Sequence, residues 1–533
     1  MLRSTQRPLV ALLLMLPLVG CGSPEPRDGP RLMVMLVGDQ LIPEQLERYD
    51  EHYSGGLRRL LDEGFRFDNA AHDHGVTETA AGHATLSTGV YPKTHGIVAN
   101  DWYEFDAAGE ARFVYAVADS LSSIVGIPER AGRSPRNLVR GGMADWIVDA
   151  DSGAHVVSVS KKDRAAITMA GRAPGHVYWL DAEQGRYVTS AWYRQSTPAG
   201  VEDFNRDART RLLSDSIWQS TIPPGLERVV PRGDRAPYEA DGIHTTFPHR
   251  FHEEGDASSP AGFNEWMAER PMVDAATLAL ATTAVGELGM GEDDIVDYLS
   301  VALSQVDYVG HRYGPLSVEQ FDTLLRLDRL LGEFFGFLDG EIGAGGWVLG
   351  FSSDHGVQPV PEYLREIGQP GGRVGGGDFW AAARLVREAL PDAAGAVSGP
   401  EQERIAQVLE ELDFVADAMT RAELAGPPSA DSLIRLQQNS YFAGRMPGPL
   451  HRYGVHLEIR LPHGTVEYTG GGTNHGSPYW HDRHVPLIFL GAGVRPGRSD
   501  GRVHTVDVAP TLAALAGIPV PADLAGRDLF RWR

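Results

Sequence analysis

The sequence contains a series of largely apolar runs, most of them followed at once by charged side chains. The runs cover residues 32–37, 155–160, 297–306, 346–353 and 485–490. Unbroken apolar runs of this length are typical of strands that are buried on both faces in a parallel sheet. Helical spacing of apolar residues at 43–63 and 317–338 fills two of the intervals. The pattern predicts an α/β fold, with a mostly parallel central sheet and helices on both of its faces.

Four of these predicted strands carry charged residues at their carboxyl ends. Asp39 follows the first, Lys162 and Arg164 follow the second, Asp307 follows the third and Asp354 follows the fourth. In an open α/β sheet, ligands bind outside the carboxyl ends of the strands. We therefore expect these side chains to converge on one edge of the sheet and to form a site there.

The alternation of strands and helices is interrupted twice. Residues 170–290 are rich in Gly, Pro, Trp and Tyr, and residues 360–465 begin with a Gly-rich stretch. We interpret both as insertions, the first of them as a cap. The core would then consist of three parts, at residues 31–169, 291–359 and 466–533.

The first 21 residues have the layout of a secretory signal peptide. Arg3 and Arg7 precede an apolar run at 9–19, which is too short to span a bilayer comfortably. The run leads into Leu-Val-Gly-Cys21, which resembles a bacterial lipobox, and Cys21 is the only cysteine of the sequence. We expect Cys21 to be lipidated, with residues 22–30 as a flexible tether. The prediction is a membrane-anchored bacterial lipoprotein, periplasmic or at the cell surface, without disulfide bonds.

The chain is acidic, with a formal net charge of −23 over 533 residues. This charge argues against binding through nucleic-acid phosphates, which requires clustered lysine and arginine. An anionic substrate would need local positive charge, such as metal ions. The length allows one large α/β domain with insertions and a sizeable core. We expect the chain to be a monomer.

Residues 77–100 carry a candidate nucleophile, Thr79, just ahead of a short helical pattern. Free backbone N–H groups and the helix dipole favour a phosphate or another anion at a helix N-terminus. Taken alone, a threonine at such a place more often only caps the helix. Thr77 is the alternative nucleophile.

Six Asp and His side chains lie at or near the predicted strand ends. They are Asp39, Asp307, His311, Asp354, His355 and His475. Imidazole nitrogen and carboxylate oxygen are ligands of Zn²⁺, at about 2.0–2.2 Å. Six ligands suffice for two sites, and two ions about 3.5–4 Å apart can activate a nucleophile and hold the leaving oxygen in displacement at phosphorus. A lone histidine is more often a satisfied hydrogen-bonding group, and we interpret His83, His95 and His484 as structural residues or as residues that support the metal ligands.

Seven blocks of sequence resemble one family. They are Asp39, Thr79-Ala-Ala-Gly-His-Ala-Thr-Leu-Ser-Thr-Gly, His95-Gly-Ile-Val-Ala-Asn100-Asp-Trp-Tyr, Lys162-Asp-Arg164-Ala-Ala-Ile, Asp307-Tyr-Val-Gly-His311, Ser353-Asp354-His355-Gly and Gly472-Thr-Asn-His475-Gly. Together they resemble the alkaline phosphatase superfamily, most of all its phosphate-irrepressible, Zn-dependent alkaline phosphatase branch with a threonine nucleophile. That branch is a close relative of the nucleotide pyrophosphatase/phosphodiesterases. The family often has Pro where Ala81 stands, a difference that concerns helix initiation rather than chemistry.

The resemblance implies two Zn²⁺ ions per chain. One ion, which also contacts Thr79, would be bound by Asp39, Asp354 and His355. The other would be bound by Asp307, His311 and His475.

The resemblance also implies roles in catalysis. Thr79 would attack phosphorus and form a phosphothreonine intermediate, which is then hydrolysed. Asn100 would donate a hydrogen bond to a phosphoryl oxygen, and Lys162 and Arg164 would supply positive charge to the other oxygens. A monoester dianion carries more charge on these oxygens than a diester, so this pair favours a phosphomonoesterase acting on small phosphate esters outside the cytoplasm. Lys161 is available in a second register, but the Lys-x-Arg spacing matches the family through Lys162.

Other functions are compatible with parts of the pattern. A phosphodiesterase or nucleotide pyrophosphatase would use the same metal core and differ in its preferred ester. A phosphonate or phospholipid hydrolase stays open, because the insertions carry no recognisable motif. A type I sulfatase is disfavoured, because it requires Cys or Ser where Thr79 stands. A non-catalytic binding protein is disfavoured because all six ligands are present.

Overall fold

The computed structural model describes residues 29–106, 110–390, 397–448, 450–462, 465–467 and 471–531. The predicted signal peptide, Cys21 and most of the tether lie outside these residues. Within the described part of the chain, no helix is long and apolar enough to cross a membrane.

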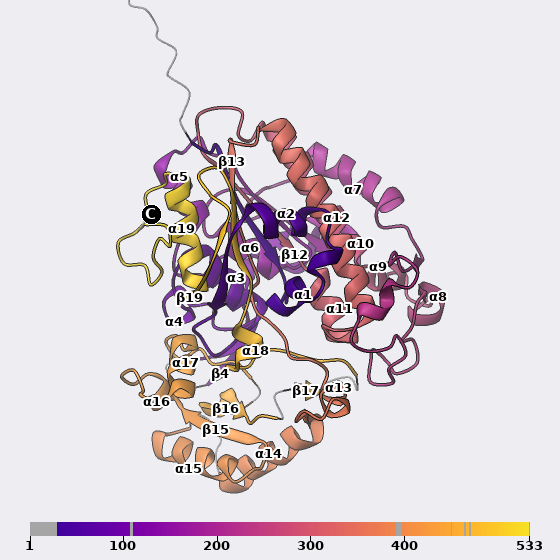
Figure 1. Cartoon of the computed structure of the whole chain (residues 1–533). Coiled ribbons are helices and arrows are strands. Elements are labelled where there is room, and N and C mark those ends of the chain that lie inside the picture. Colours follow the sequence, from indigo (N-terminus) through magenta and orange to yellow (C-terminus); the bar gives the residue numbers. More distant parts are fainter. Residues whose placement is uncertain are drawn as a thin grey trace, which may run out of the picture.

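A large twisted sheet forms the centre of the molecule (Figure 1). Its strands, in spatial order, are β19 (Gly497–His504), β2 (Phe65–Ala71), β18 (Leu487–Gly491), β13 (Trp347–Ser352), β1 (Leu32–Gly38), β12 (Asp297–Leu303), β7 (Val156–Ser160), β8 (His176–Asp181) and β9 (Arg186–Val188). The central strands β13, β1, β12, β7 and β8 run parallel, whereas β18 and β9 run antiparallel to their neighbours. The predicted α/β fold with a mostly parallel sheet is confirmed.

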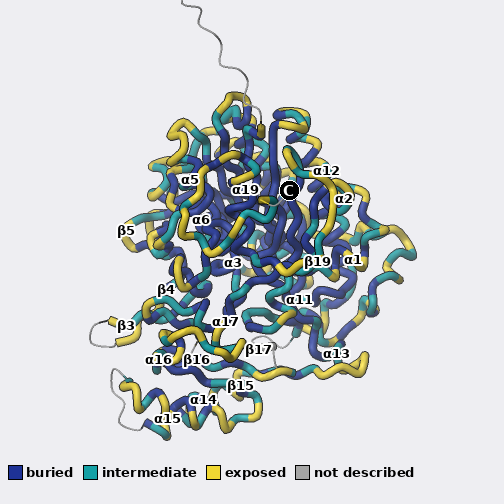
Figure 2. The backbone as a smooth tube through the Cα atoms, turned by 60° about the vertical axis from the view of Figure 1, so that its left-hand side comes forward, coloured by how far each residue is buried: buried dark blue, intermediate teal, exposed yellow. Residues whose placement is uncertain are grey.

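The central strands are buried on both faces because helices cover each side. Along β1, Leu32, Val34 and Leu36 pack into one hydrophobic cluster and Met33, Met35 and Val37 into another. The first cluster includes residues of α2 (Gly56–Glu63), α10 (Met272–Leu288) and α12 (Val318–Glu341), and the second those of α5 (Met143–Ala150), α6 (Asp163–Ala170) and α19 (Val508–Leu515). Successive side chains of a strand point to opposite faces, so an unbroken apolar run fills both layers. Figure 2 shows this buried centre in dark blue.

The strands near the sheet's edges, β19, β2, β8 and β9, were not predicted. β19 is largely exposed along its length, and β2 alternates between buried and half-buried residues. β8 and β9 lie within residues 170–290, which we interpreted as an insertion, so this stretch supplies part of the sheet as well as surface segments.

The predicted helix at 43–63 is broken into α1 (Pro43–Arg48), a 3₁₀ turn at Asp50–His52, and α2. α2 begins where the chain meets α12. A Cβ at Gly55 or Gly56 would overlap the backbone of α12, and the Asp328 carboxylate accepts hydrogen bonds from the backbone N–H groups of Ser54, Gly55 and Leu57 at 2.7–2.8 Å. The tertiary contact therefore sets the start of this helix.

Residues 360–465, which we call the insertion lobe, form a small lobe with a hydrophobic core of its own. The lobe, in orange in the lower part of Figure 1, contains α14 (Gly376–Ala389), α15 (Gly399–Glu410), α17 (Ser432–Ser440) and the antiparallel pair β15 (Val415–Thr420) and β16 (Val455–Ile459). It meets the main body beside a hairpin of β3 (Asp101–Phe105) and β4 (Ala111–Tyr115), where Tyr103 and Met446 form a β-bridge.

Candidate active site

Strands β1, β13, β7 and β12 bring the predicted strand-end residues together at one edge of the sheet. Asp39 directly follows β1, while Asp354 and Lys162 each lie two residues beyond β13 and β7. β12 ends earlier than predicted, at Leu303, and Asp307 and His311 lie on α11 (Gln305–Tyr313) rather than on a loop. Because residues four apart lie on one face of a helix, α11 directs both side chains into the site.

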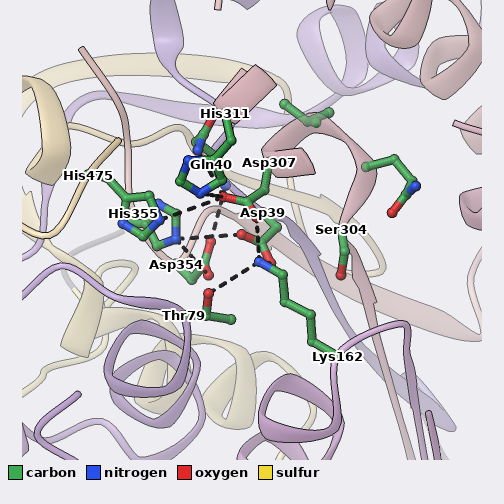
Figure 3. Close-up of polar contacts among 12 residues, drawn as sticks. Asp39, Gln40, Thr79, Lys162, Ser304, Asp307, His311, Asp354, His355 and His475 are labelled. Carbon is green, nitrogen blue, oxygen red and sulfur yellow. Dashed lines mark hydrogen bonds and ion pairs between the residues drawn. The ribbon is translucent and has the colours of Figure 1, made fainter. Parts of the chain in front are cut away.

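The Lys162 ammonium contacts two of the carboxylates and the Thr79 hydroxyl (Figure 3). Its Nζ is 2.7 Å from Asp39 Oδ2, 2.7 Å from Asp307 Oδ2 and 3.2 Å from Thr79 Oγ1. All four side chains are buried. A buried cation between two buried carboxylates offsets part of the cost of taking each charge out of water.

Three histidines surround the same carboxylates. His311 Nε2 is 3.1 Å from Asp307 Oδ1, and His475 Nε2 is 3.7 Å from the same oxygen. His355 Nε2 is 3.5 Å from Asp39 Oδ1 and 3.4 Å from Asp354 Oδ2. The six predicted ligands therefore meet in one place, from segments that are far apart in the sequence.

The backbone fixes the orientation of each of these rings. The Nδ1–H groups of His311, His355 and His475 donate to the carbonyl oxygens of Thr473, Gly356 and Thr77, at 2.9, 3.1 and 2.7 Å. A carbonyl oxygen only accepts, so each Nδ1 holds the proton in the neutral ring. The Nε2 atoms then face the carboxylates, and in the neutral ring their lone pairs are available to a metal ion, as in metal-ligating histidines.

The electrostatics suit cation binding. Burial lowers the pKa of His475 well below its usual range, as do the neighbouring His355 and His311, so the His475 ring is neutral. Burial alone would raise the pKa of Asp307, but His311 and Lys162 hold it well below its usual value. Burial and the nearby Asp354 carboxylate raise the pKa of Asp39. The ionised form of Asp39 is therefore disfavoured in this site, and added positive charge, such as a metal ion, would stabilise it.

The residues present fit the binding of metal ions. Asp39 Oδ1, Asp354 Oδ2 and His355 Nε2 are buried and have no hydrogen-bond partner within the described part of the chain. Such orphaned groups are costly unless a ligand satisfies them. Three sets of donor atoms lie close enough together to bind an ion: Asp307, His311 and His475; Asp39, Asp307 and His355; and Asp39, His83 and Asp354. The first set coincides with one of the two predicted ligand sets.

Thr79 is the first residue of α3 (Thr79–Thr88), and the capping position is taken by Glu78. Its hydroxyl faces Lys162 rather than the helix backbone. The alternative nucleophile, Thr77, donates its hydroxyl proton to the carbonyl oxygen of Ser477 at 2.8 Å. Asn100 Oδ1 accepts from the Ala80 backbone N–H at 2.9 Å, which leaves the Nδ2 donor of the amide for another partner.

A cavity of about 610 Å³ opens above the site. Thr79, Asn100, Lys162 and Arg164 all line it, together with Asp307, His311 and His475. Lys161 does not line this cavity: its ammonium lies 3.4 Å from the ring centroid of Tyr308, beside a separate cavity of about 230 Å³. The register through Lys162 therefore brings the lysine to the nucleophile.

Two further residues, Gln40 and His83, contact the metal-ligand candidates, and only Gln40 carries no signal in the sequence. Gln40 has a positive φ of 67° and bridges the metal-ligand candidates. Its backbone N–H donates to Asp354 Oδ1 at 3.2 Å and its Nε2 to Asp307 Oδ1 at 2.8 Å. His83, which we interpreted as a structural residue or one that supports the metal ligands, donates from Nδ1 to the Thr79 carbonyl at 2.8 Å, and this atom lies 3.2 Å from Asp354 Oδ2.

His95 and His484 lie outside the group of metal-ligand candidates. His95 contacts Thr85 Oγ1 through Nε2, at 3.1 Å. His484 donates from Nε2 to the Asp68 carbonyl and stacks on Trp480. Both contacts are of the kind expected for structural histidines.

The chain matches known proteins over nearly its whole length. Residues 33–446 match the family of type I phosphodiesterase / nucleotide pyrophosphatase. Alkaline phosphatase PafA of Elizabethkingia meningoseptica is 30% identical over 98% of both chains, and alkaline phosphatase PhoV of Synechococcus elongatus is 31% identical over 93% of this chain and 92% of its own. The crystal structure of PafA superposes with a TM-score of 0.83, at 28% identity, over 94% of this chain and 98% of PafA. The chain therefore belongs to the type I phosphodiesterase and nucleotide pyrophosphatase family, and within it to the branch that contains alkaline phosphatases such as PafA.

Proposed function

We propose that this protein is a zinc-dependent alkaline phosphatase that releases phosphate from small phosphate monoesters through a phosphothreonine intermediate. One observation carries the proposal: six Asp and His ligands, a threonine hydroxyl at a helix start and a lysine meet at the carboxyl edge of the sheet. The relatives PafA and PhoV are alkaline phosphatases, which supports the same activity here.

Two Zn²⁺ ions would be held by the two predicted ligand sets. Asp39, Asp354 and His355 would hold one, beside Thr79, and Asp307, His311 and His475 would hold the other. The orphaned buried oxygens and the Nε2 atoms that face them support this assignment. When bound, such ions lower the pKa of a hydroxyl or water and stabilise a leaving oxygen.

The protein side chains would then act on the phosphoryl group. Thr79 Oγ1 attacks phosphorus and displaces the alcohol, which leaves phosphate on Thr79 until water hydrolyses it. The free Nδ2 donor of Asn100 binds one phosphoryl oxygen. Lys162 and Arg164 supply positive charge to the others, and this charge is worth most where negative charge is highest.

A phosphodiesterase is the second candidate, because the matched family is described as type I phosphodiesterase / nucleotide pyrophosphatase. Two lining cations beside Thr79 favour the monoesterase. A diester has one ionised phosphoryl oxygen and would gain less from Lys162 and Arg164 than a monoester dianion.

We also propose a location and an organisation for the chain. Cys21 would carry a lipid that anchors the protein to a bacterial membrane, in the periplasm or at the cell surface, and the folded part would act as a monomer. The core would comprise residues 31–169, 291–359 and 466–533 together with β8, β9 and α10, and the remainder of 170–290 and residues 360–465 would be insertions. Mass spectrometry of the N-terminal peptide from the membrane fraction tests the anchor, because a diacylated Cys21 has a distinct mass.

The activity is tested by comparing kcat/KM of the zinc-loaded protein for an aryl phosphate with that for the matching methyl aryl diester. We expect a preference for the monoester of several orders of magnitude, about 10³-fold or more, which a chelator abolishes and Zn²⁺ restores. A preference for the diester would identify the protein as a phosphodiesterase, and nucleophilic attack by Thr79 would still be compatible with that result. No metal-dependent activity on either ester would contradict both candidates.

A further inference from the structure

The cavity above Thr79 extends well beyond the groups that would handle phosphate, so its outer part must receive the alcohol portion of an ester. The insertion lobe supplies one wall of this outer part, through residues that include Phe379, Leu450, His451, Leu457 and Glu458. Tyr103 and Phe113 of the β3–β4 hairpin also line the cavity, with ring centroids 5.7 Å apart. In Figure 1 the lobe lies directly below the main body, with β16 near its upper part.

A line of hydrogen bonds runs through this wall. Gln437 Nε2 donates to Glu458 Oε2 at 2.7 Å, and His456 Nε2 lies 3.4 Å from the same oxygen. The Ile459 backbone N–H donates to Glu458 Oε1 at 3.1 Å. These three donors hold the buried Glu458 side chain in one orientation.

The same line fixes the tautomers of two stacked histidines. Because His456 Nε2 donates to Glu458, its Nδ1 carries the lone pair and accepts from His451 Nε2 at 2.9 Å. His451 Nδ1 is then also a lone-pair acceptor. It is buried and has no hydrogen-bond partner in the part of the chain that the structure describes. The wall thus contains the Glu458 side chain, which lines the cavity, next to two histidine rings that accept or donate hydrogen bonds within the lobe.

The charges on the rest of the cavity have the same sign. Glu78, Asp101 and Glu458 line it. Among its described lining residues, the lysine and arginine side chains are those of Lys162 and Arg164, which lie at the reacting centre. An anionic group on the alcohol portion would therefore meet carboxylates without a cation to pair with. A like-charge contact in a partly desolvated cavity costs free energy, whereas a hydroxyl or ammonium group gains an acceptor.

We propose, on the basis of the phosphomonoesterase function above, that the acidic wall selects the substrate by its alcohol portion. It favours monoesters of neutral or cationic alcohols that carry hydrogen-bond donors, and it disfavours monoesters whose alcohol carries a second anionic group. Glu458 is the specificity-determining residue, His456 and Gln437 position it, and Asp101 adds to the same field.

The test compares two esters that differ at one carbon, glycerol 3-phosphate and 3-phosphoglycerate, which carry a hydroxymethyl group and a carboxylate. We expect kcat/KM of the wild-type protein to favour glycerol 3-phosphate at least about tenfold. Glu458→Gln keeps the size of the side chain and removes the charge, so it should reduce that ratio at least about threefold. Asp101→Asn should reduce it in the same direction without disturbing the insertion lobe. Glu403→Gln, the same change at an exposed position of α15, should leave the ratio unaltered.

A wild-type ratio near one, or a ratio that Glu458→Gln and Asp101→Asn leave as unchanged as Glu403→Gln does, would overturn the proposed selection while the phosphomonoesterase function stands. Phosphate release from neither ester, nor from an aryl phosphate, would instead overturn the phosphomonoesterase function, and the selection with it.

Discussion

Gly82 of α3 packs directly against the backbone of Asp354, so closely that a Cβ at position 82 would overlap the Asp354 carbonyl oxygen. This contact joins the helix that begins with Thr79 to the strand end that carries two of the metal-ligand candidates. The neighbouring His83 adds to this contact between α3 and the strand end, because its Nδ1 contacts both the Thr79 carbonyl and Asp354 Oδ2. The distance between nucleophile and ligands is therefore set by backbone packing.

Gly82→Ala should destabilise the protein and separate these groups. The added methyl has no free space, and overpacking of this kind costs roughly 1–3 kcal/mol in the free energy of unfolding. Urea unfolding measures that loss, and competition with a chelator should show weaker metal retention. The control is Gly336→Ala on α12, where a Cβ meets nothing within 4 Å. That change should be neutral or stabilise the helix by up to about 1 kcal/mol. Equal stabilities for the two variants would contradict the packing argument.

Thr79→Ala should lower kcat for an aryl phosphate by at least about 10³-fold while the metal content stays the same, because the hydroxyl is the proposed nucleophile and not a necessary ligand. Metal analysis of the purified variant tests whether its metal content is unchanged. Thr77→Val removes the other candidate hydroxyl and its bond to the Ser477 carbonyl. It should cost about 1 kcal/mol of stability and retain turnover. Turnover by Thr79→Ala comparable to the wild type would exclude Thr79 as the nucleophile.

The centre of the sheet was predictable because its strands are buried on both faces. β1, β7, β12 and β13 are therefore largely apolar and do not alternate with exposed polar residues, and the polar residues after them mark the ligand-binding edge. β2 and β19 were not predicted, because many of their side chains contact solvent and their sequences therefore contain no long apolar run. Their pairing depends on neighbours distant in the sequence, which no local pattern records.

The parts of the site that could be predicted are those whose residue types, Asp and His, commonly bind metal ions in proteins. Asp and His at strand ends indicate metal ligands, and α11 confirms the proximity of Asp307 and His311 although we had expected a loop. Gln40 was not predictable, since its role follows from a positive φ and from contacts with two carboxylates more than 260 residues away. Glu458 is a similar case, because nothing near it in the sequence shows that it faces the cavity.

Removing both Lys162 and Arg164 by substitution with alanine should lower kcat/KM for an aryl phosphate monoester by about 10²-fold or more, and that for the matching diester by much less. The reason is the greater charge of the monoester dianion. Lys161→Ala is the matched control, because Lys161 borders the separate cavity and should leave both values within about twofold. Equal losses of kcat/KM on the two esters in the double variant would refute the proposal that Lys162 and Arg164 favour the monoester dianion.

His95 should make the protein sensitive to acid. Burial lowers its pKa to about 3, and Arg445 adds to the effect. The Ile97 backbone N–H donates to His95 Nδ1 at 3.2 Å and His95 Nε2 contacts Thr85, so a second ring proton would point at a donor. The pKa in the unfolded chain is about 6.5. The unfolded state therefore binds the additional proton between about pH 3 and 6.5, and stability falls as the pH falls through that window.

His95→Asn removes this titration and keeps an acceptor near the position of Nδ1. The variant should be less stable at pH 8, where the loss of the Thr85 contact costs about 1 kcal/mol. Between pH 4 and 6 its free energy of unfolding should depend less steeply on pH, by up to about 1.4 kcal/mol per pH unit, because one fewer proton is taken up on unfolding. The exposed His252, changed to Asn, should leave the slope as in the wild type. Urea unfolding across this pH range measures the slopes, and parallel curves for His95→Asn and the wild type would show that His95 does not carry the effect.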